Sequence, residues 1–444
     1  MKDLPYRKTN KRAVFLLIFV ILVSIIAGTT YNIGAKKQPI ILEVALYSGD
    51  SWNVPQKNAY TIYDEAARLF EEAYADQNVQ IVFRSGRLIN DYSEWFAEQV
   101  LMGNEADVFL VLEEDFSTYA SIGLLEDLTP YIEKDNAFRL GDYYSKALMA
   151  GQYYGQQYAL PFEVAPTFLV VNRSLLKQEN LDISAENWTW DTFYDVCASV
   201  TKDLDGDGQL DQFGVYDYGW ENAFYTNDEM LFPNDGSNVA YNDDRMTETI
   251  SFMKKMYALN RGTVVQESDF DDGKVAFKIF SLPEYRAYGT YPYRILKYEN
   301  FEWEAIPLPS GPNGSRSSKL YTVQMGMSSR SKNKDLAYEF IKFATNQVEV
   351  QQKVWEETYA LPALRSVVES IYNSNIPEVR ENKVVNASFL EEIIDQSYTD
   401  PHFKKYAPLK TLMNQQIFQI IAQDMDIPAG LKELRQELKK KIIE

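Results

Sequence analysis

The sequence predicts an α/β protein of two lobes joined by one extended segment, with a membrane helix in front. Between residues 40 and 111, apolar runs typical of strands alternate with amphipathic helical patterns, the order expected for a mainly parallel sheet. Residues 160–172 are apolar and hold Pro161 and Pro166, which disfavour helix and indicate an extended crossing. A second set of elements follows that crossing. The 444 residues suffice for two to three domains.

The first lobe is predicted from strands at 40–47, 79–83 and 106–111 and from helices at 60–74 and 92–101. In a parallel sheet, ligands meet the loops after the carboxyl ends of the strands, here 47–55, 84–90 and 112–116. Aromatic rings stack on the C–H faces of sugars and carboxylates accept sugar hydroxyl hydrogens. These loops therefore favour a sugar site, and the alternative is exposed loop charge beside a surface tryptophan. They offer Tyr47, Asp50, Trp52, Arg84, Glu113, Glu114 and Asp115.

The second lobe is predicted from a helix at 190–200, capped by Thr189, and from strands at 213–216 and 274–280. The segment 303–309 leads into an exposed loop at 310–315 and a return crossing, and a strand is expected after it at 321–327. Further helices are expected at 246–260, 412–423 and 431–443, and 282–285 is expected to be a turn. The last helix has an apolar stripe, which suits packing on the lobe or a partner surface. An aromatic run around Trp220 and the acid Glu163 in the crossing are both placed at the cleft, although Glu163 also suits a solvated strand edge. The expected units are residues 1–37, lobe 1 at 38–163 with 319–363, and lobe 2 at 164–318 with 364–444.

An acidic loop follows the 190–200 helix. Acids at alternate positions and a glycine match the first nine positions of a calcium loop, but the twelfth position is Gly214 instead of glutamate. Calcium is therefore one interpretation, and a tight Asp/Gly turn is the other. The ligands would be Asp203, Asp205, Asp207 and Asp211. No other cofactor is expected.

Composition excludes several classes of function. The net charge of −20 repels phosphate backbones, so nucleic acid is not an expected partner. Cys197 is the only cysteine and lies on an apolar helix face, and His402 is the only histidine. One histidine and one cysteine cannot form a multi-histidine metal site and leave little basis for a catalytic triad. We expect a monomeric binding protein rather than an enzyme, with a two-carboxylate glycosidase as the alternative.

The N-terminus predicts a membrane segment. Five cations within the first twelve residues precede an uncharged run at 13–35, long enough to cross a bilayer with the bulk of the chain outside. Cleavage as a signal peptide, followed by secretion, is the alternative. Residues 26–29 resemble a lipoprotein lipobox with Thr29 in place of the cysteine, so thioether lipidation is not expected. We favour a single-pass signal anchor.

Taken in order, the segments resemble the family 1 extracellular solute-binding proteins of bacterial ABC importers, the group of the maltodextrin-binding proteins. The resemblance covers roughly 38–444 and rests on 103–111, 116–130 (with Gly-Leu-Leu-Glu-Asp-Leu-Thr-Pro), 158–172, 189–201, 203–214, 273–277, 306–314 and 331–343. It implies a type 2 periplasmic-binding-protein fold that closes about a hinge and delivers cargo to the membrane subunits of an ABC permease.

The resemblance also assigns roles to particular residues. It places Glu114 and Glu163 near positions that bond sugar hydroxyls, and Trp220 and Tyr285 near stacking aromatics. We therefore expect capture of a sugar or oligosaccharide between two lobes. A membrane-anchored sugar sensor or scaffold of the same fold is the alternative, motivated by the missing lipid attachment.

Overall fold

The computed structural model describes residues 38–49, 52, 54–55, 57–184, 187–289, 293–295, 297–374, 384–423 and 425–443. The predicted anchor at 13–35 lies outside them. Within the described ranges, no helix is both long and apolar enough to cross a membrane.

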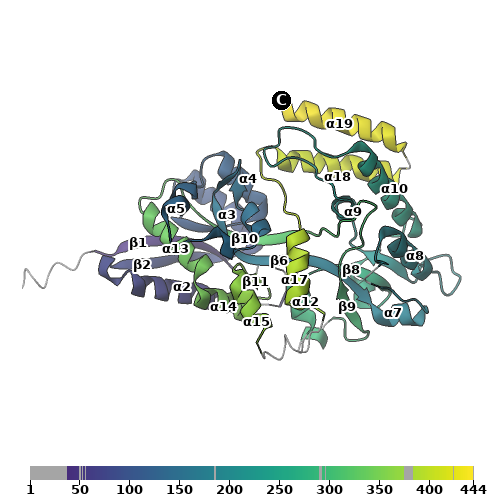
Figure 1. Ribbon diagram of the computed structural model, residues 1–444, viewed down its shortest axis with the longest axis horizontal. Helices are drawn as coiled ribbons and strands as arrows, with labels where there is room; N and C mark the ends of the chain where they lie inside the picture. Colours follow the sequence, from purple (N-terminus) through teal and green to yellow (C-terminus); the bar gives the residue numbers. More distant parts are fainter. Residues whose placement is uncertain are drawn as a thin grey trace, which may run out of the picture.

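One mixed sheet runs through the molecule in the order β2-β1-β3-β10-β6-β8-β7, and β9 and β11 also pair with β6 (Figure 1). As predicted, β1, β2 and β3 are parallel, and they are joined by helices. The bounds in this first part are β1 Ile40–Ser48, α2 Tyr60–Ala73, β2 Val79–Leu88, α3 Ile89–Leu101, β3 Val108–Val111, α4 Glu113–Ser121, α5 Thr129–Lys134, α6 Ser145–Met149, β4 Gln152–Tyr153 and β5 Gln156–Gln157. Short 3₁₀ turns occur at Ala75–Gln77, Leu140–Asp142 and Tyr293–Ile295.

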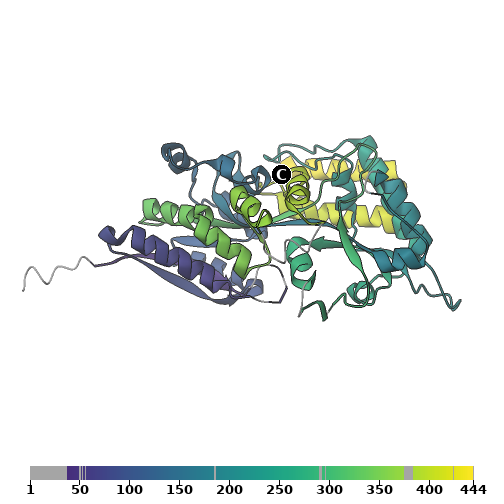
Figure 2. The same ribbon diagram turned by 60° about the horizontal axis from the view of Figure 1, so that its bottom comes forward.

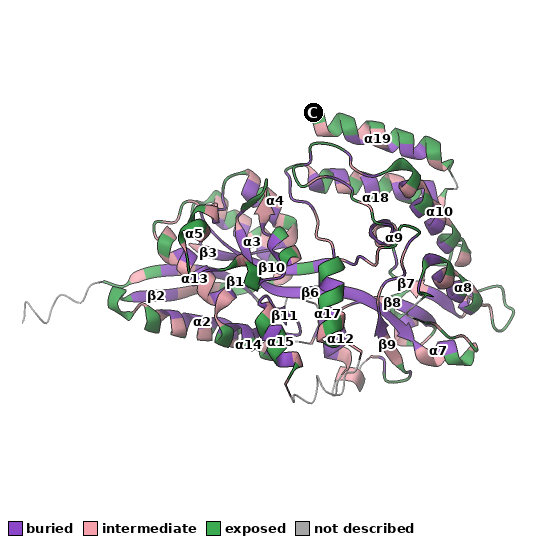
Figure 3. Cartoon of the chain, in the orientation of Figure 1, coloured by how far each residue is buried: buried purple, intermediate pink, exposed green. Residues whose placement is uncertain are grey.

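The strand β6 (Ala159–Asn172) is buried along all its length and belongs to both halves of the sheet (Figure 3). Its first part pairs with β10 (Leu320–Met327), and its second part pairs with β8 (Val275–Ser281) and β9 (Trp303–Ile306). The strand runs through Pro161 and Pro166 without a break, so the extended crossing is confirmed.

Helices cover both faces of each half (Figures 1 and 2). In the first half α2, α13 and α14 form one layer, and α3, α4 and α6 lie on the other face. In the second half α8 packs on β7, and α10, α18 and α19 pack together outside it. The remaining bounds are α7 Arg173–Gln178, α8 Trp190–Val200, β7 Phe213–Tyr216, α9 Trp220–Thr226, α10 Asp243–Leu259, α11 Glu267–Asp271, α12 Leu282–Gly289, α13 Lys334–Asn346, α14 Val348–Glu357, β11 Leu361–Pro362, α15 Arg365–Tyr372, α17 Ala387–Gln396, α18 Tyr406–Ala422 and α19 Ile427–Ile443.

Three segments pass between the lobes and are hydrogen-bonded to one another. The backbone N–H and hydroxyl of Thr167 on β6 donate to the Lys319 carbonyl at 3.0 and 2.8 Å. Tyr398, on the third segment, donates its N–H to the Ser318 carbonyl and accepts from the N–H of Leu320, both at 2.9 Å. Since all three crossings are tied at one level, this level is the natural axis for rotation of one lobe against the other.

Several local expectations need correction. Residues 282–285 begin the helix α12 instead of forming a turn, because proline is tolerated in the first turn of a helix. Residues 84–88 belong to β2, and Glu113 and Glu114 lie in the first turn of α4 instead of a loop. By contrast, α8 has the predicted bounds with Thr189 as its N-cap, and the stripe of α19 packs into the second lobe's core. Cys197 is buried there.

Candidate functional site

A cleft of about 630 Å³ lies between the two lobes. Its walls come from the N-terminus of α4 in the first lobe, from the segment leading into α9 in the second, and from all three crossing segments. A second cavity of about 240 Å³ shares Asp217 and Ile279 with it, and we call the two together the interlobe cleft. The cleft is therefore built where the fold permits the lobes to close.

The larger part of the cleft holds two of the predicted site residues. Glu114 lies on the first-lobe wall and Trp220 on the second-lobe wall. Trp220 is held in place by a 3.0 Å hydrogen bond from its indole Nε1 to Oδ1 of Asn414 on α18. Tyr321, 41% exposed, adds a further aromatic ring to the lining of this part.

The smaller part of the cleft holds Trp52, which reaches back to a third predicted residue. The indole Nε1 of Trp52 donates to Oε2 of Glu163 at 2.7 Å. Glu163 is 2% exposed inside β6, so in this conformation its carboxylate orients Trp52 instead of lining the cavity. A direct bond from Glu163 to a ligand stays a prediction.

Tyr285 lies on α12 and is 9% exposed. Its ring packs edge-on against Phe168 of β6 and Trp303 of β9, with centroids 5.4 and 5.2 Å apart. The structure therefore places Tyr285 in the core beside the crossing strand, outside the two cavities of the interlobe cleft. Its predicted stacking on a ligand stays a prediction.

A chain of alternating charges forms the floor of the larger part. Lys319 contacts Glu113 at 2.6 Å and Asp400 at 2.9 Å, and Lys410 contacts Glu221 at 2.5 Å and Asp400 at 3.8 Å. Asp400 lies on the third crossing segment and bridges Lys319 of the second crossing segment and Lys410 of α18. Burial raises the pKa of Glu113, although Lys319 opposes the shift. Burial also acts to raise the pKa of Asp400, but Lys319 and then Lys410 outweigh it and lower that pKa.

A second charged cluster lines the smaller part. The Lys278 side chain is 5% exposed, and its ammonium donates to Glu284 at 2.7 Å, Glu267 at 3.0 Å and the Tyr298 hydroxyl at 3.1 Å. The pKa of Glu267 is lowered to about 2, chiefly by a hydrogen bond from Lys297 and further by one from Lys278, although burial acts in the opposite direction. The buried ammonium is therefore fully satisfied by the protein itself.

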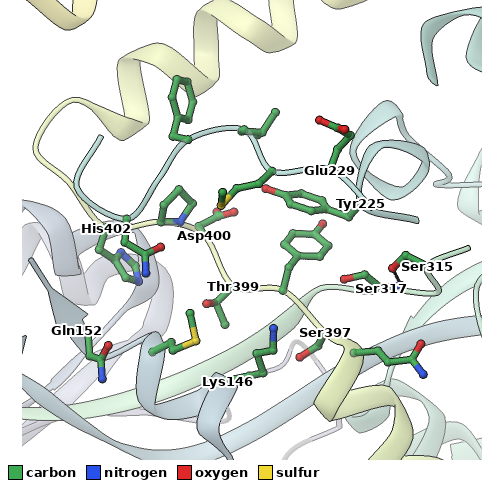
Figure 4. A pocket seen from close by; sticks show the side chains of 18 of the residues that line it. Lys146, Gln152, Tyr225, Glu229, Ser315, Ser317, Ser397, Thr399, Asp400 and His402 are labelled. Atoms are coloured by element: carbon green, nitrogen blue, oxygen red, sulfur yellow. Dashed lines mark hydrogen bonds between the residues drawn. The ribbon is translucent and has the colours of Figure 1, made fainter. Parts of the chain in front are cut away.

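A groove of about 270 Å³, which we call the hinge-side groove, lies against the third crossing segment. Figure 4 shows Tyr225 and Glu229 of the second lobe on one side and Lys146 and Gln152 of the first lobe on the other, with Asp400 between them. Tyr398, Asp400 and His402 line both this groove and the cleft. His402 contacts the Ser117 hydroxyl through Nδ1 at 3.2 Å, and burial lowers its pKa to about 4.

The acidic loop is remote from both cavities. Carboxylate oxygens of Asp203, Asp205 and Asp211 lie within 4.8 Å of one another, and Asp207 is not among them. Asp203 also accepts the N–H groups of Gly206 and Gly208 at 2.7 and 2.9 Å. This geometry gathers hard oxygen donors of the kind calcium binds, and it equally closes a tight turn.

Comparison with known families decides the relationship. The model for the bacterial extracellular solute-binding proteins matches residues 53–350, more than half of the sequence. The chain belongs to this family. A galactooligosaccharide-binding protein of Bacillus subtilis (strain 168) is 25% identical over 304 residues, which are 64% of this chain and 65% of that protein, so the match leaves a third of the relative's length uncovered.

Several solved structures of similar fold carry descriptions that name a sugar as the ligand. A cyclic alpha-maltosyl-1,6-maltose binding protein from Arthrobacter globiformis superposes with a TM-score of 0.72 at 16% identity, covering 91% of this chain and 99% of that one. The sugar-binding protein MalE from Xanthomonas citri gives 0.70 at 16% identity, with 91% and 97% covered. A Listeria monocytogenes ABC substrate-binding protein, solved with cycloalternan, gives 0.67 at 18% identity, with 91% and 99% covered. At these identities the likeness shows the two-lobed fold alone.

Of the charged residues on the floor of the cleft, the sequence analysis pointed to Glu113 but not to its partners Lys319 and Asp400. Lys319 and Asp400 are 206 and 287 positions away from Glu113 in the sequence, and no local pattern signals their contacts. Lys278 had a signal: in a strand it shares a face with Ala276 and Phe280, both fully buried, so a buried lysine was to be expected there.

Proposed function

We propose that this protein is the extracellular carbohydrate-binding component of an ABC importer, capturing a sugar or oligosaccharide between its two lobes. The observation that carries the proposal is the interlobe cleft, in which Trp220 and Tyr321 offer aromatic faces and Glu114 offers a hydrogen-bond acceptor. Such a mixture suits a ligand with flat C–H faces and a rim of hydroxyls. The sugar ligands in the descriptions of the similar proteins support the same class.

Closure of the lobes about the tied crossings would complete the site. We propose lobes of residues 38–163 with 319–363 and 164–318 with 364–444. Rotation at Thr167, Lys319 and Tyr398 would bring Trp220 and Glu114 onto opposite sides of one sugar ring and exclude water from their contacts. The closed form is then the form that we expect the membrane subunits of a permease to recognise.

A panel of saccharides, tested by the shift in melting temperature, checks this function. Neutral and amino mono- to tetrasaccharides with α and β linkages form the panel, and amino acids and short peptides of similar mass are the control. A binder present at 100 times its dissociation constant stabilises the folded state by about 2.7 kcal/mol, which is a shift of several degrees. Shifts from saccharides alone support the proposal, and shifts from peptides alone contradict it.

Attachment to the membrane is a further part of the proposal. The uncharged run at 13–35, behind a basic tip, supports a retained anchor with the lobes outside the cell. Mass spectrometry of the protein extracted from membranes tests it. An intact N-terminus confirms the anchor, whereas a mature chain that begins beyond Thr29 indicates cleavage and secretion.

We also propose calcium as the ion of the acidic loop, supported by the three gathered carboxylates. Isothermal titration with calcium is expected to give heat in the wild type and none in the variant Asp203→Asn, whose amide keeps the size of the side chain. No heat in the wild type, with no effect of EDTA on melting, would leave the loop as a simple turn.

A further inference from the structure

The lysines that line the interlobe cleft are almost all neutralised by the protein. Seven carboxylates and five lysines line the two cavities, an excess of two negative charges. Four lysines each have a carboxylate within 3 Å, so they offer little attraction to an anionic ligand. The pairs are Lys278–Glu284, Lys297–Glu267, Lys319–Glu113 and Lys410–Glu221.

Two carboxylates remain that have no such partner. Within the part of the chain that the structure describes, neither Glu114 nor Asp217 makes a hydrogen bond or an ion pair through its side chain. Glu114 comes from the first lobe and Asp217 from the second, so closure brings them toward the same ligand. Asp217 also borders both parts of the cleft, where any ligand that spans them must pass.

The backbone of Asp217 supports a role in binding. Its φ of +61° is a left-handed conformation that few residues other than glycine adopt, although aspartate tolerates it better than most. Burial raises the pKa of Asp217, while Lys278 opposes the shift. Asp217 therefore lies between the two parts of the cleft with no hydrogen bond or ion pair to its carboxylate within the described residues.

The aromatic surroundings favour a cation at this place. Trp220 and Tyr321 line the larger part with Asp217, and Trp52 and Tyr216 line the smaller part with it. The faces of such rings attract ammonium groups, most strongly where water is excluded. Lys404 is the one lysine of the cleft that has no ion pair in the described ranges. It is exposed on the segment before α18 and lines the larger part of the cleft only.

We infer that the cleft selects saccharides that carry a protonated amino group over their neutral counterparts, with Asp217 as the specificity-determining residue and Glu114 as its partner. The inference rests on the proposed function. Lobe closure removes water from both carboxylates, and a hydrogen bond from a sugar hydroxyl compensates only part of this desolvation penalty. An ammonium group replaces that hydration through a charge-assisted hydrogen bond to a carboxylate.

The test uses matched pairs that differ in one substituent, an amine or a hydroxyl. Calorimetry of the full chain at low salt compares the β-1,4 glucosamine trisaccharide with cellotriose, and glucosamine with glucose. We expect roughly tenfold tighter binding of the amino member, the scale of one charge-assisted hydrogen bond. Asp217→Asn, which keeps shape and removes charge, should reduce the preference to about twofold or less.

A matched control separates local recognition from the overall charge of the chain. Glu433→Gln removes one exposed carboxylate on α19, outside both cavities, and should leave the preference unchanged. Equal binding of the two members, tighter binding of the neutral member, or an equal loss for both in Asp217→Asn overturns the inference and leaves the proposed function standing. If no saccharide binds at all, both fail.

Discussion

The interlobe cleft and the hinge-side groove share one wall, formed by Tyr398, Asp400 and His402, but their other side chains differ in kind. The cleft has a chain of charges on its floor, and its sides carry aromatic rings and two acids, Glu114 and Asp217, that pair with no cation among the described residues. The groove is smaller, about 270 Å³ against 630 Å³ for the cleft's larger part, and its rim carries the exposed apolar side chains of Met149, Tyr154 and Met230.

Under the proposed function, the cleft takes the ligand and the groove accommodates the motion of the lobes. Because the two cavities lie on either side of the same segment, rotation about that segment narrows one while it widens the other. Polar groups poised for a ligand gather on the cleft side. The groove side holds Lys146, whose ammonium has no ion pair within the described ranges.

The largest expected effect is on stability, and it distinguishes Lys319 of the cleft from Lys146 of the groove. Lys319→Met leaves Glu113 and Asp400 without their shared cation, and we expect a loss of about 3 kcal/mol in the free energy of unfolding. Lys146→Met in the groove is the matched control and should change it by less than about 0.5 kcal/mol. Urea titration followed by tryptophan fluorescence measures both, and similar losses for the two variants would remove the contrast.

The next effect concerns the aromatic residues of the two cavities. Trp220→Ala removes a stacking surface from the cleft, so the affinity for the best saccharide of the panel should fall by about 2 kcal/mol, roughly thirtyfold. Tyr154→Ala takes an exposed ring, 58% accessible, from the groove and should leave that affinity unchanged. Calorimetry measures the affinity of both variants. A loss of affinity in Tyr154→Ala would mean that the ligand binds in the hinge-side groove instead of the cleft.

The shared wall itself predicts a dependence on pH. His402 has a pKa of about 4 in the folded protein because it is buried, against about 6.5 when unfolded. As the pH falls through that interval, the unfolded chain takes up a proton that the folded chain does not, so stability is lost on acidification. Between pH 7.5 and 5 the wild type should lose about 2 kcal/mol more than His402→Asn. Parallel pH curves for the two proteins would contradict a buried neutral histidine.

The smallest effect is expected where the cleft meets the crossing strand. Trp52→Phe keeps the ring but loses the hydrogen bond from Nε1 to Glu163, at an expected cost of about 1 kcal/mol in the free energy of unfolding. Trp95→Phe is the control, because the Trp95 indole N–H makes no hydrogen bond with the described residues. Equal costs would indicate that the bond contributes nothing.

Much of the fold was predictable because its signals are local. Thr189 marked the start of α8 as its N-cap, and the predicted strands at 213–216 and 274–280 agree with β7 and β8 within a residue. The failures have local causes too. Pro283 suggested a turn although it lies in the first turn of α12, and the acids after β3 suggested a loop although a helix N-terminus favours negative charge.

The site was predictable only in part, since it depends on contacts between distant segments. Trp52, Glu114 and Trp220 line the cavities, and aromatic and acidic composition pointed to them. The link between Trp52 and Glu163, the position of Tyr285 in the core and the bridging role of Asp400 each depend on which strands cross at the hinge. No spacing within one segment carries that information.

Small-angle X-ray scattering tests the central claim of lobe closure most directly. The full chain is measured alone and with the saccharide that gives the largest melting shift. We predict a smaller radius of gyration with the saccharide, and the same radius for Trp220→Ala at that saccharide concentration as for the protein alone. An unchanged radius in the wild type at saturation would contradict capture by closure.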